Sequence, residues 1–233
     1  MWWVTSQKNG ASALGLQRVL GMGSYETSWT WLHKLRRAMV RPGRDQLSGE
    51  VEADETFVGG VEPGGGGRHI GHKSLVAIAA EVRGRGTGRI RMRSVRDGSA
   101  RSLVAFVKDC VVPGSTIITD GLTSYDGLEE AGYIHRKRIQ RGASEKPDRL
   151  LPRVHRVAAL LKRWLLGTHQ GRVERAHLPY YLDEYTFRFN RRSSTHRGLL
   201  FYRLMQQAVA MQPTPYATLV GGLKELRISN VGT

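Results

Sequence analysis

The sequence predicts an α/β fold in which a mixed sheet is flanked by helices, with a short helical segment at the amino terminus. Three observations support this prediction. Residues with strand periodicity are concentrated between positions 50 and 95, helical periodicity dominates the last third of the chain, and strands and helices alternate between these regions. Hydrophobic residues make up 40% of the 233 residues, which is enough to build a buried core.

The amino-terminal segment is expected to be helical. Residues 13–20 are apolar at helical spacing, and Ser24 or Thr27 can cap a second helix that follows a glycine-containing turn. Two short helices joined in this way are typical of a helix-turn-helix, so residues 1–45 are predicted to be a DNA-binding segment. Two helices of an ordinary packing subdomain fit the same pattern equally well.

The remaining elements follow in a defined order. Three strands, a helix, a strand, a helix and a strand precede three further helices, and this is the element order of an RNase H-like core. The expected strands are 50–60, 74–82, 88–95, 115–120 and 133–139, and the expected helices are 99–111, 124–132, 152–167, 177–192 and 198–211. Residues 46–211 are therefore predicted to form one domain, followed by a tail at 212–233. Glycine-rich residues 61–73 and polar residues 141–149 are expected to be loops.

The charge of the chain points to a polyanionic partner. The sequence has 36 Lys and Arg against 20 Asp and Glu, a formal net charge of +16. Nucleic acid is the first candidate partner and an anionic membrane surface is the second. A single cysteine, Cys110, excludes an internal disulfide framework and a multi-cysteine zinc site in this chain. No apolar stretch reaches the roughly 20 residues that cross a bilayer, and the amino terminus lacks the features of a signal peptide, which predicts a cytoplasmic protein.

Two aspartates are candidates for a metal site. Asp54 lies within the strand 50–60, where a buried carboxylate is costly unless it is paired or holds a metal. Asp120 ends an apolar strand and directly precedes Gly121, a position where α/β sheets often carry functional groups. If the two strands are neighbours, the carboxylates face each other and can hold two Mg²⁺ ions that cleave a phosphodiester bond. A solvated strand residue and a turn-forming aspartate are the alternative interpretations.

A third ligand is expected from the helix 152–167, which contains no acidic residue. His155 and Lys162 lie two turns apart on one face of this helix, and a neutral imidazole can ligate a metal, for which Mn²⁺ is better suited than Mg²⁺. A histidine that contacts phosphate or water is the alternative. Glu52 lies on the strand face of the first aspartate and is an auxiliary candidate, whereas Glu55 points to the opposite face.

Basic residues occur in several runs that are candidates for phosphate contacts. The planar fork of arginine can bind two phosphate oxygens, whereas lysine acts as a point charge. A solvated helix face can explain any one run, but a net charge of +16 makes it a poor explanation of all of them. The predicted DNA-binding residues are Lys162, Arg163, Arg188, Arg191 and Arg192, and a further basic run extends from His135 to Arg141.

Several stretches form a specific combination. They are TSQKNGASALGLQRVLGMGSYETSW, VEADETFVGG, GSTIITDGLTSYDGLEEAGYIH, PRVHRVAALLKRWLLGTHQG and HLPYYLDEYTFRFNRR followed by RGLLFYRL. Together they resemble the insertion-sequence transposases of the IS1595 group, which contain an ISXO2-like transposase domain. The resemblance extends over most of residues 5–204.

The resemblance implies an RNase H-like, DDE-type recombinase that cuts DNA at the ends of its own insertion sequence and joins them to target DNA. It implies that Asp54 and Asp120 are the first two metal-binding acids, and that residues 46–211 are the catalytic domain. In this superfamily the third acid lies about seven residues before a Lys or Arg, and counting back from Lys162 gives His155. The implied cofactor is Mg²⁺ or Mn²⁺. The implied partner is double-stranded DNA, both the element ends and the target. The active complex is expected to be a homo-oligomer, and the protein is expected to be associated with the nucleoid.

Two departures from the family pattern leave alternatives open. His155 stands where an acid is expected, and one cysteine cannot form the amino-terminal zinc ribbon that members of the family often carry. One alternative is therefore an amino-terminally truncated, catalytically inactive remnant that only binds DNA. Another is a structure-selective nuclease of the same fold that performs no strand transfer.

Overall fold

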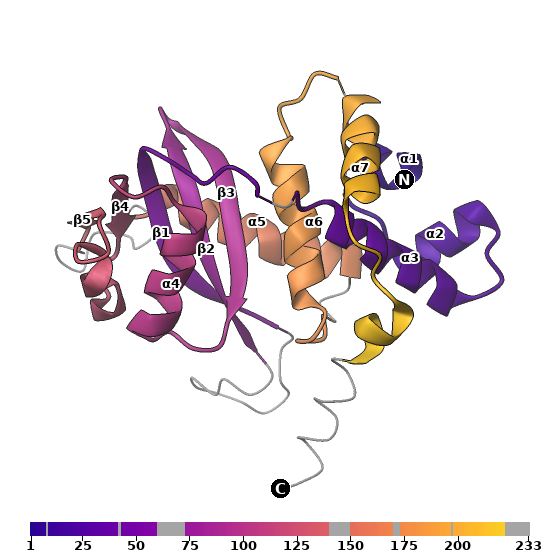
Figure 1. Ribbon diagram of the computed structural model, residues 1–233, viewed down its shortest axis with the longest axis horizontal. Coiled ribbons are helices and arrows are strands. Elements are labelled where there is room, and N and C mark those ends of the chain that lie inside the picture. The colour runs from indigo at the N-terminus through magenta and orange to yellow at the C-terminus, as the bar shows by residue number, and fades with distance from the viewer. Residues whose placement is uncertain are drawn as a thin grey trace, which may run out of the picture. The chain divides into compact units, whose positions relative to one another are not determined.

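The structure is a computed structural model that describes residues 1–7, 9–41, 43–59, 73–139, 150–169, 173–196 and 198–221 (Figure 1). The chain divides into two compact units, which we name by their content. The sheet unit is Asp45–Leu166, and the helical unit combines Met1–Arg44 with Gly167–Thr233. The loops expected at 61–73 and 141–149 lie outside the described residues apart from Lys73, as does the end of the tail predicted at 212–233.

The sheet unit contains one mixed five-stranded sheet. The elements are β1 (Glu50–Val58), β2 (Ser74–Arg83), β3 (Gly86–Val95), α4 (Ala100–Cys110), β4 (Thr116–Thr119), the short 3₁₀ helix η1 (Thr123–Leu128), β5 (Ile134–Lys137) and α5 (Pro152–His169). The strand order is β3-β2-β1-β4-β5. The first three strands are antiparallel, and β4 runs parallel to both β1 and β5. The predicted α/β fold is confirmed, and the first and fourth strands are neighbours, which is the condition on which the two-aspartate site depends.

The alternation of side chains along β1 separates an apolar face from a functional one. Val51 and Ala53 belong to a buried cluster that includes Leu103 and Phe106 of α4, the helix on the near side of the sheet in Figure 1. The residues between and after them point to the opposite face of the strand. That face carries Glu52 and Asp54, which contact the beginning of α5.

The observed elements differ from the predicted ones mainly at their ends. The third strand begins at Gly86 rather than at residue 88, because Gly84 adopts a positive φ of 54° and a tight turn pairs Arg83 with Gly86. The helix predicted at 124–132 is a 3₁₀ helix over Thr123–Leu128 followed by turns. Glycines at positions 127 and 132 interrupt this segment, which explains why no full α-helix forms.

The helical unit consists of α1 (Trp2–Ser6), α2 (Ala13–Leu20), α3 (Tyr25–Ala38), α6 (Leu178–Asn190) and α7 (Gly198–Ala210). Serine caps begin two of these helices: the Ser12 hydroxyl accepts from the Gly15 amide at 3.0 Å, and Ser24 accepts from Thr27 at 3.4 Å. The buried cluster of this unit joins Leu32 of α3 to Phe187 of α6.

The amino-terminal helices are therefore not a module of their own. A pair as short as α2 and α3 cannot bury its apolar side alone, so α6 and α7 complete its core. The two compact units are divided near residue 45 and, within α5, after Leu166. The predicted domains 1–45, 46–211 and 212–233 stay predictions. The DNA-binding role of residues 1–45 stays a prediction.

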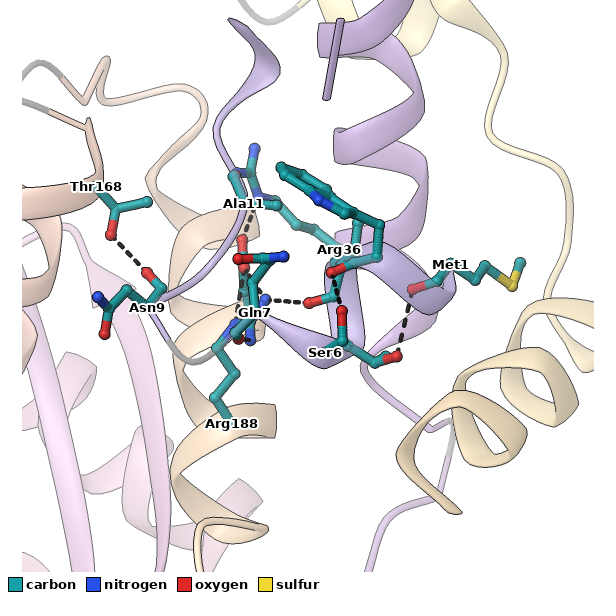
Figure 2. Close-up of polar contacts among 12 residues, drawn as sticks. Met1, Ser6, Gln7, Asn9, Ala11, Arg36, Thr168 and Arg188 are labelled. Carbon is teal, nitrogen blue, oxygen red and sulfur yellow. Dashed lines mark hydrogen bonds and ion pairs between the residues drawn. The ribbon is translucent and has the colours of Figure 1, made fainter. Parts of the chain in front are cut away.

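Within the helical unit, a buried network of ion pairs and hydrogen bonds joins the amino-terminal segment to α6. Glu184 is 1% exposed and accepts hydrogen bonds from Arg36 and Arg188, each at 2.8 Å. Both arginines also donate to backbone carbonyls, Arg36 to Ala11 at 3.3 Å and Arg188 to Gln7 at 2.7 Å, as Figure 2 shows. Removing one partner of such a buried pair typically costs about 3–5 kcal/mol, since the other charge is left uncompensated.

The helical unit should lose stability in mild acid because of a buried histidine. His33 is fully buried, and burial, followed by the charges of Arg36, His177 and His169, lowers its pKa to about 2. The unfolded chain therefore binds a proton below pH 6.5 that the folded chain rejects. The free energy of unfolding should fall by up to about 1.4 kcal/mol per pH unit below that value.

Thermal unfolding from pH 7.5 to pH 5 measures this effect. His33→Gln should make the pH dependence shallower, with a residual slope from His169, whose pKa burial lowers to about 4. The exposed His196 provides the matched control, because His196→Gln should leave the slope as in the wild type. An unaltered slope in His33→Gln would show that His33 is not the source.

Candidate active site

The parallel pairing of β1 and β4 brings Asp54 and Asp120 to the same end of the sheet. The ladder pairs Glu50 with Thr116 and Glu52 with Ile118, and the same offset continued by two residues matches Asp54 with Asp120. Asp54 lies two residues after Glu52 on β1, so its side chain points to the same α5 face, whereas Asp120 directly follows the end of β4. The two candidate carboxylates are electrostatic neighbours, since the charge of Asp120 raises the pKa of Asp54.

Asp54 is the more deeply placed of the two carboxylates. Its side chain is 16% exposed; one oxygen accepts the Glu55 amide at 2.8 Å and the other lies 3.0 Å from the Nε2 atom of His155. Burial raises the pKa of Asp54, and the backbone hydrogen bond and the neighbouring His155 oppose that rise. Asp120 is exposed, and its Oδ1 atom accepts the Leu122 amide at 3.0 Å.

The turn after Asp120 requires a glycine. Gly121 has a φ of 94°, a conformation that side chains disfavour, and a Cβ atom there would lie 3.0 Å from Ile139. The turn directs the chain away from the end of β4 and leaves the Asp120 carboxylate accessible. The Asp-Gly pair noted in the sequence therefore has a structural reason as well as a candidate chemical role.

A third carboxylate adds to the negative charge near the site. Glu55 accepts a hydrogen bond at 3.0 Å from the hydroxyl of Tyr125, a residue of the cluster on the α4 side. Burial, and then the negative charge of Asp54, raise the pKa of Glu55 to about 7, while the bond from Tyr125 opposes this rise. Sequence reasoning placed Glu55 on the opposite face, which its Tyr125 contact confirms, but missed its electrostatic coupling to the aspartates.

The residues suit a divalent cation by their chemistry. Asp54 and Asp120 supply the carboxylate oxygens that Mg²⁺ prefers, His155 supplies a nitrogen that suits Mn²⁺, and the mutual repulsion of the carboxylates would be relieved by a cation. Among the described residues, no group of three or more His, Cys, Asp or Glu is placed so that it could hold a metal ion. The structure shows Asp54 and His155 in contact, and Asp120 as the charged neighbour of Asp54.

The position of His155 follows from the helix that carries it. α5 begins at Pro152, and its buried stripe of Val154, Val157 and Leu161 turns His155 to the edge of the packed face. The side chain of His155 is 27% exposed, compatible with contact to both Asp54 and an entering ligand. Glu184, an acidic residue further along the chain, lies in the helical unit and is held by two arginines.

The predicted DNA-binding residues fall into two groups. Lys162 and Arg163 are exposed on α5, so their predicted role stays open. Arg188 donates hydrogen bonds to Glu184 and to the carbonyls of Gln7 and Val4, and its DNA-binding role stays a prediction.

Two further arginines are held by their own helix. Arg191 lies 4.1 Å from the centre of the Phe187 ring, and Arg192 lies 4.0 Å from that of Phe189 and donates to its carbonyl. These contacts cover aromatic side chains and make the pair weaker candidates for phosphate binding than sequence reasoning suggested.

The basic run on β5 is also largely engaged within the sheet unit. Its partners are charged or polar groups on neighbouring elements. His135 bonds to Thr119, Arg136 to Glu50, Lys137 to Asp126, and Arg138 to the Leu150 carbonyl. Much of the positive charge in this run therefore supports the sheet.

A mixed sheet with aspartates at the ends of two adjacent parallel strands, flanked by helices, is the arrangement of an RNase H-like transposase domain. The ISXO2-like transposase domain matches residues 46–190, and the chain belongs to that family.

The chain is also similar to an uncharacterised protein in transposable element ISH50 of Halobacterium salinarum. The two are 27% identical over 182 residues, which cover 71% of this chain and 60% of the relative. The chain thus spans less than two thirds of that protein. None of the helices in the described ranges is long and apolar enough to cross a membrane.

Proposed function

We propose that the chain is a transposase that cuts DNA at the ends of its insertion sequence and joins those ends to target DNA. The observation that carries the proposal is the contact between Asp54 and His155, with Asp120 at the end of the neighbouring parallel strand, in a family of transposases. Asp54 and Asp120 would hold two Mg²⁺ ions, and His155 would complete the site. When bound, the metal supplies activation of the attacking oxygen and stabilisation of the leaving oxygen.

The reaction consists of two phosphoryl transfers. Water attacks phosphorus at the element end, the bond to the 3′ oxygen breaks, and a 3′ hydroxyl and a 5′ phosphate result. The freed 3′ hydroxyl then attacks a target phosphodiester, forming a new bond and releasing a target 3′ hydroxyl. The carboxylates would hold the metal ions beside the reacting groups, while arginine and lysine side chains bind the phosphates. Joining two element ends requires at least two chains, so a homo-oligomer is part of the proposal.

Incubation with labelled duplexes carrying the two element ends tests the proposal. Cleavage at the element boundary that requires Mg²⁺ or Mn²⁺, followed by joined products with target DNA, would support it. Cleavage without joining would indicate a nuclease of the same fold. Binding without cleavage would favour the second candidate, an inactive DNA-binding remnant, which the histidine at the third ligand position favours.

The exposed basic residues of α5 should contribute to DNA affinity through counterion release. With about six phosphate contacts, the slope of log K against log salt is expected near −5, and Lys162→Ala with Arg163→Ala should flatten it by about 2. The measurement is a salt series of fluorescence anisotropy.

Lys108 and Arg101 are exposed on α4, which packs on the other face of the sheet. Their combined substitution by alanine removes the same charge and should leave the slope nearly unchanged. Equal effects of the two double variants would show that α5 is not a specific phosphate-binding surface.

A further inference from the structure

Glu52 is a buried carboxylate that the proposed chemistry does not use. Its side chain is 0% exposed, and it accepts hydrogen bonds from the backbone amides of Arg153 at 2.7 Å and Val154 at 3.1 Å. The guanidinium of Arg153 donates a third bond to it at 2.8 Å. A wholly buried charge is retained only where its partners compensate for the loss of water, and here these partners are the first turn of α5.

The start of α5 lacks a cap of its own. Pro152 has no amide hydrogen, the next two amides have no carbonyl four residues earlier within the helix, and the first turn contains no acidic residue. The His155 amide already bonds to the Leu151 carbonyl at 3.0 Å. The carboxylate of Glu52 therefore supplies from β1 both the acceptors and the negative charge that this helix end requires.

The same contact sets where His155 lies. Glu52 and Asp54 are successive residues on one face of β1, and Val154 and His155 are successive residues of α5. Anchoring the Arg153 and Val154 amides at Glu52 fixes the rotation and height of the helix against the strand, which leaves the Nε2 atom of His155 at 3.0 Å from Asp54. Arg153 adds bonds to the carbonyls of Gly84 and Gly86, at 2.8 and 3.2 Å, that hold this end against the β2–β3 turn.

We propose that Glu52 is a positioning residue of the active site, which holds α5 so that His155 meets Asp54. The effect of Glu52 on metal binding and cleavage rests on the proposed function, whereas its effect on the placement of His155 does not. A displacement of about 1 Å in a reacting group can cost about a hundredfold in rate. Loss of the Glu52 contacts should thus act on catalysis through His155 and not through DNA binding.

The test compares Glu52→Gln with Glu81→Gln. Glu81 is a matched control because, on β2 of the same unit, it also accepts two backbone amides, those of Ser48 and Arg89, and the guanidinium of Arg89. Both helix amides donate to the Oε2 atom of Glu52 and the Arg153 guanidinium donates to Oε1, so a glutamine that keeps its oxygen on the amides turns its own donor toward that guanidinium and removes the negative charge at the start of α5. The first readout is the imidazole NMR signal of His155 in protein free of metal and DNA, assigned by its loss in His155→Ala.

We expect Glu52→Gln to shift the His155 signal and to weaken Mn²⁺ binding, followed by electron paramagnetic resonance of the free ion, by about tenfold. In the cleavage assay kcat should fall while KM for DNA stays as in the wild type. Glu81→Gln should change none of these quantities, even if it lowers the melting temperature. If Glu52→Gln fails to fold, Glu52→Asp replaces it in the test, because aspartate keeps the charge on a shorter side chain. We expect Glu52→Asp to change the His155 signal, the Mn²⁺ affinity and kcat in the same direction by smaller amounts.

An unshifted His155 signal with unchanged Mn²⁺ affinity in either folded variant overturns the proposal, whatever the activity of the wild type. A shifted signal in a protein that neither binds Mn²⁺ nor cleaves DNA would leave the positioning role standing and overturn the proposed function. The two failures are therefore distinguishable.

Discussion

Asp54→Asn and Asp120→Asn are each expected to lower the rate of DNA cleavage by about a thousandfold, which corresponds to about 4 kcal/mol of lost transition-state stabilisation. Asparagine keeps the shape of the side chain and the acceptor for the Glu55 amide, but it removes the negative charge that would hold a cation. DNA affinity should be nearly unchanged, because it depends mainly on phosphate contacts. Cleavage of a labelled duplex and anisotropy of the same duplex give the two quantities.

A surface aspartate provides the control for these variants. Asp109 lies in the same unit, is 59% exposed and pairs with Arg93 at 2.8 Å. Asp109→Asn should cleave DNA at the wild-type rate. If Asp54→Asn or Asp120→Asn also retains wild-type cleavage in Mg²⁺, that residue has no place in the active site.

His155→Ala is expected to abolish cleavage, because it removes the proposed third ligand, which lies beside Asp54. Mn²⁺ should support more cleavage than Mg²⁺ in the wild type, since nitrogen ligation suits the softer ion. His155→Glu should recover part of the activity in Mg²⁺ by placing an oxygen ligand on the same helical face. The ratio of the rates in Mn²⁺ and Mg²⁺ should therefore fall in His155→Glu.

A thermal measurement gives a second view of the same variant. In His155→Glu a new carboxylate would face Asp54 and Asp120, so the metal-free protein should melt at a lower temperature than the wild type. Added Mg²⁺ should raise the melting temperature of His155→Glu by more than it raises that of the wild type. If His155 contacts phosphate or water instead, His155→Ala should cleave nearly as well as the wild type and lose only a little DNA affinity. His196→Ala, at an exposed position, should behave as the wild type throughout.

The order of elements and the main candidate residues could be predicted from the sequence because they depend on local patterns. Alternation along β1 predicts that Glu52 and Asp54 share a face, and helical spacing places His155 at the edge of the buried stripe of α5. The apolar strand that ends at Asp120 predicts a carboxylate at the end of β4. These features involve residues close together in the chain, where periodicity carries the information.

The partners of charged side chains could not be predicted in the same way. The spacing of Glu184 and Arg188 signals a helical ion pair, yet only the folded unit shows that Arg188 also binds carbonyls of the amino-terminal segment. A surplus of positive charge predicts a polyanionic partner for the chain as a whole. It does not say which arginines remain on the surface.

By itself the sequence determined the fold class, the strands that carry the two aspartates and the helix that carries His155. Only the tertiary structure decided that Glu52 caps α5, a contact between residues about a hundred positions apart in the chain. The physical reason is that a helix starting at Pro152 leaves amides unsatisfied, and any suitably placed acceptor in the fold can satisfy them. Local sequence shows the need for such a cap, but the packing of α5 on β1 selects the residue that provides it.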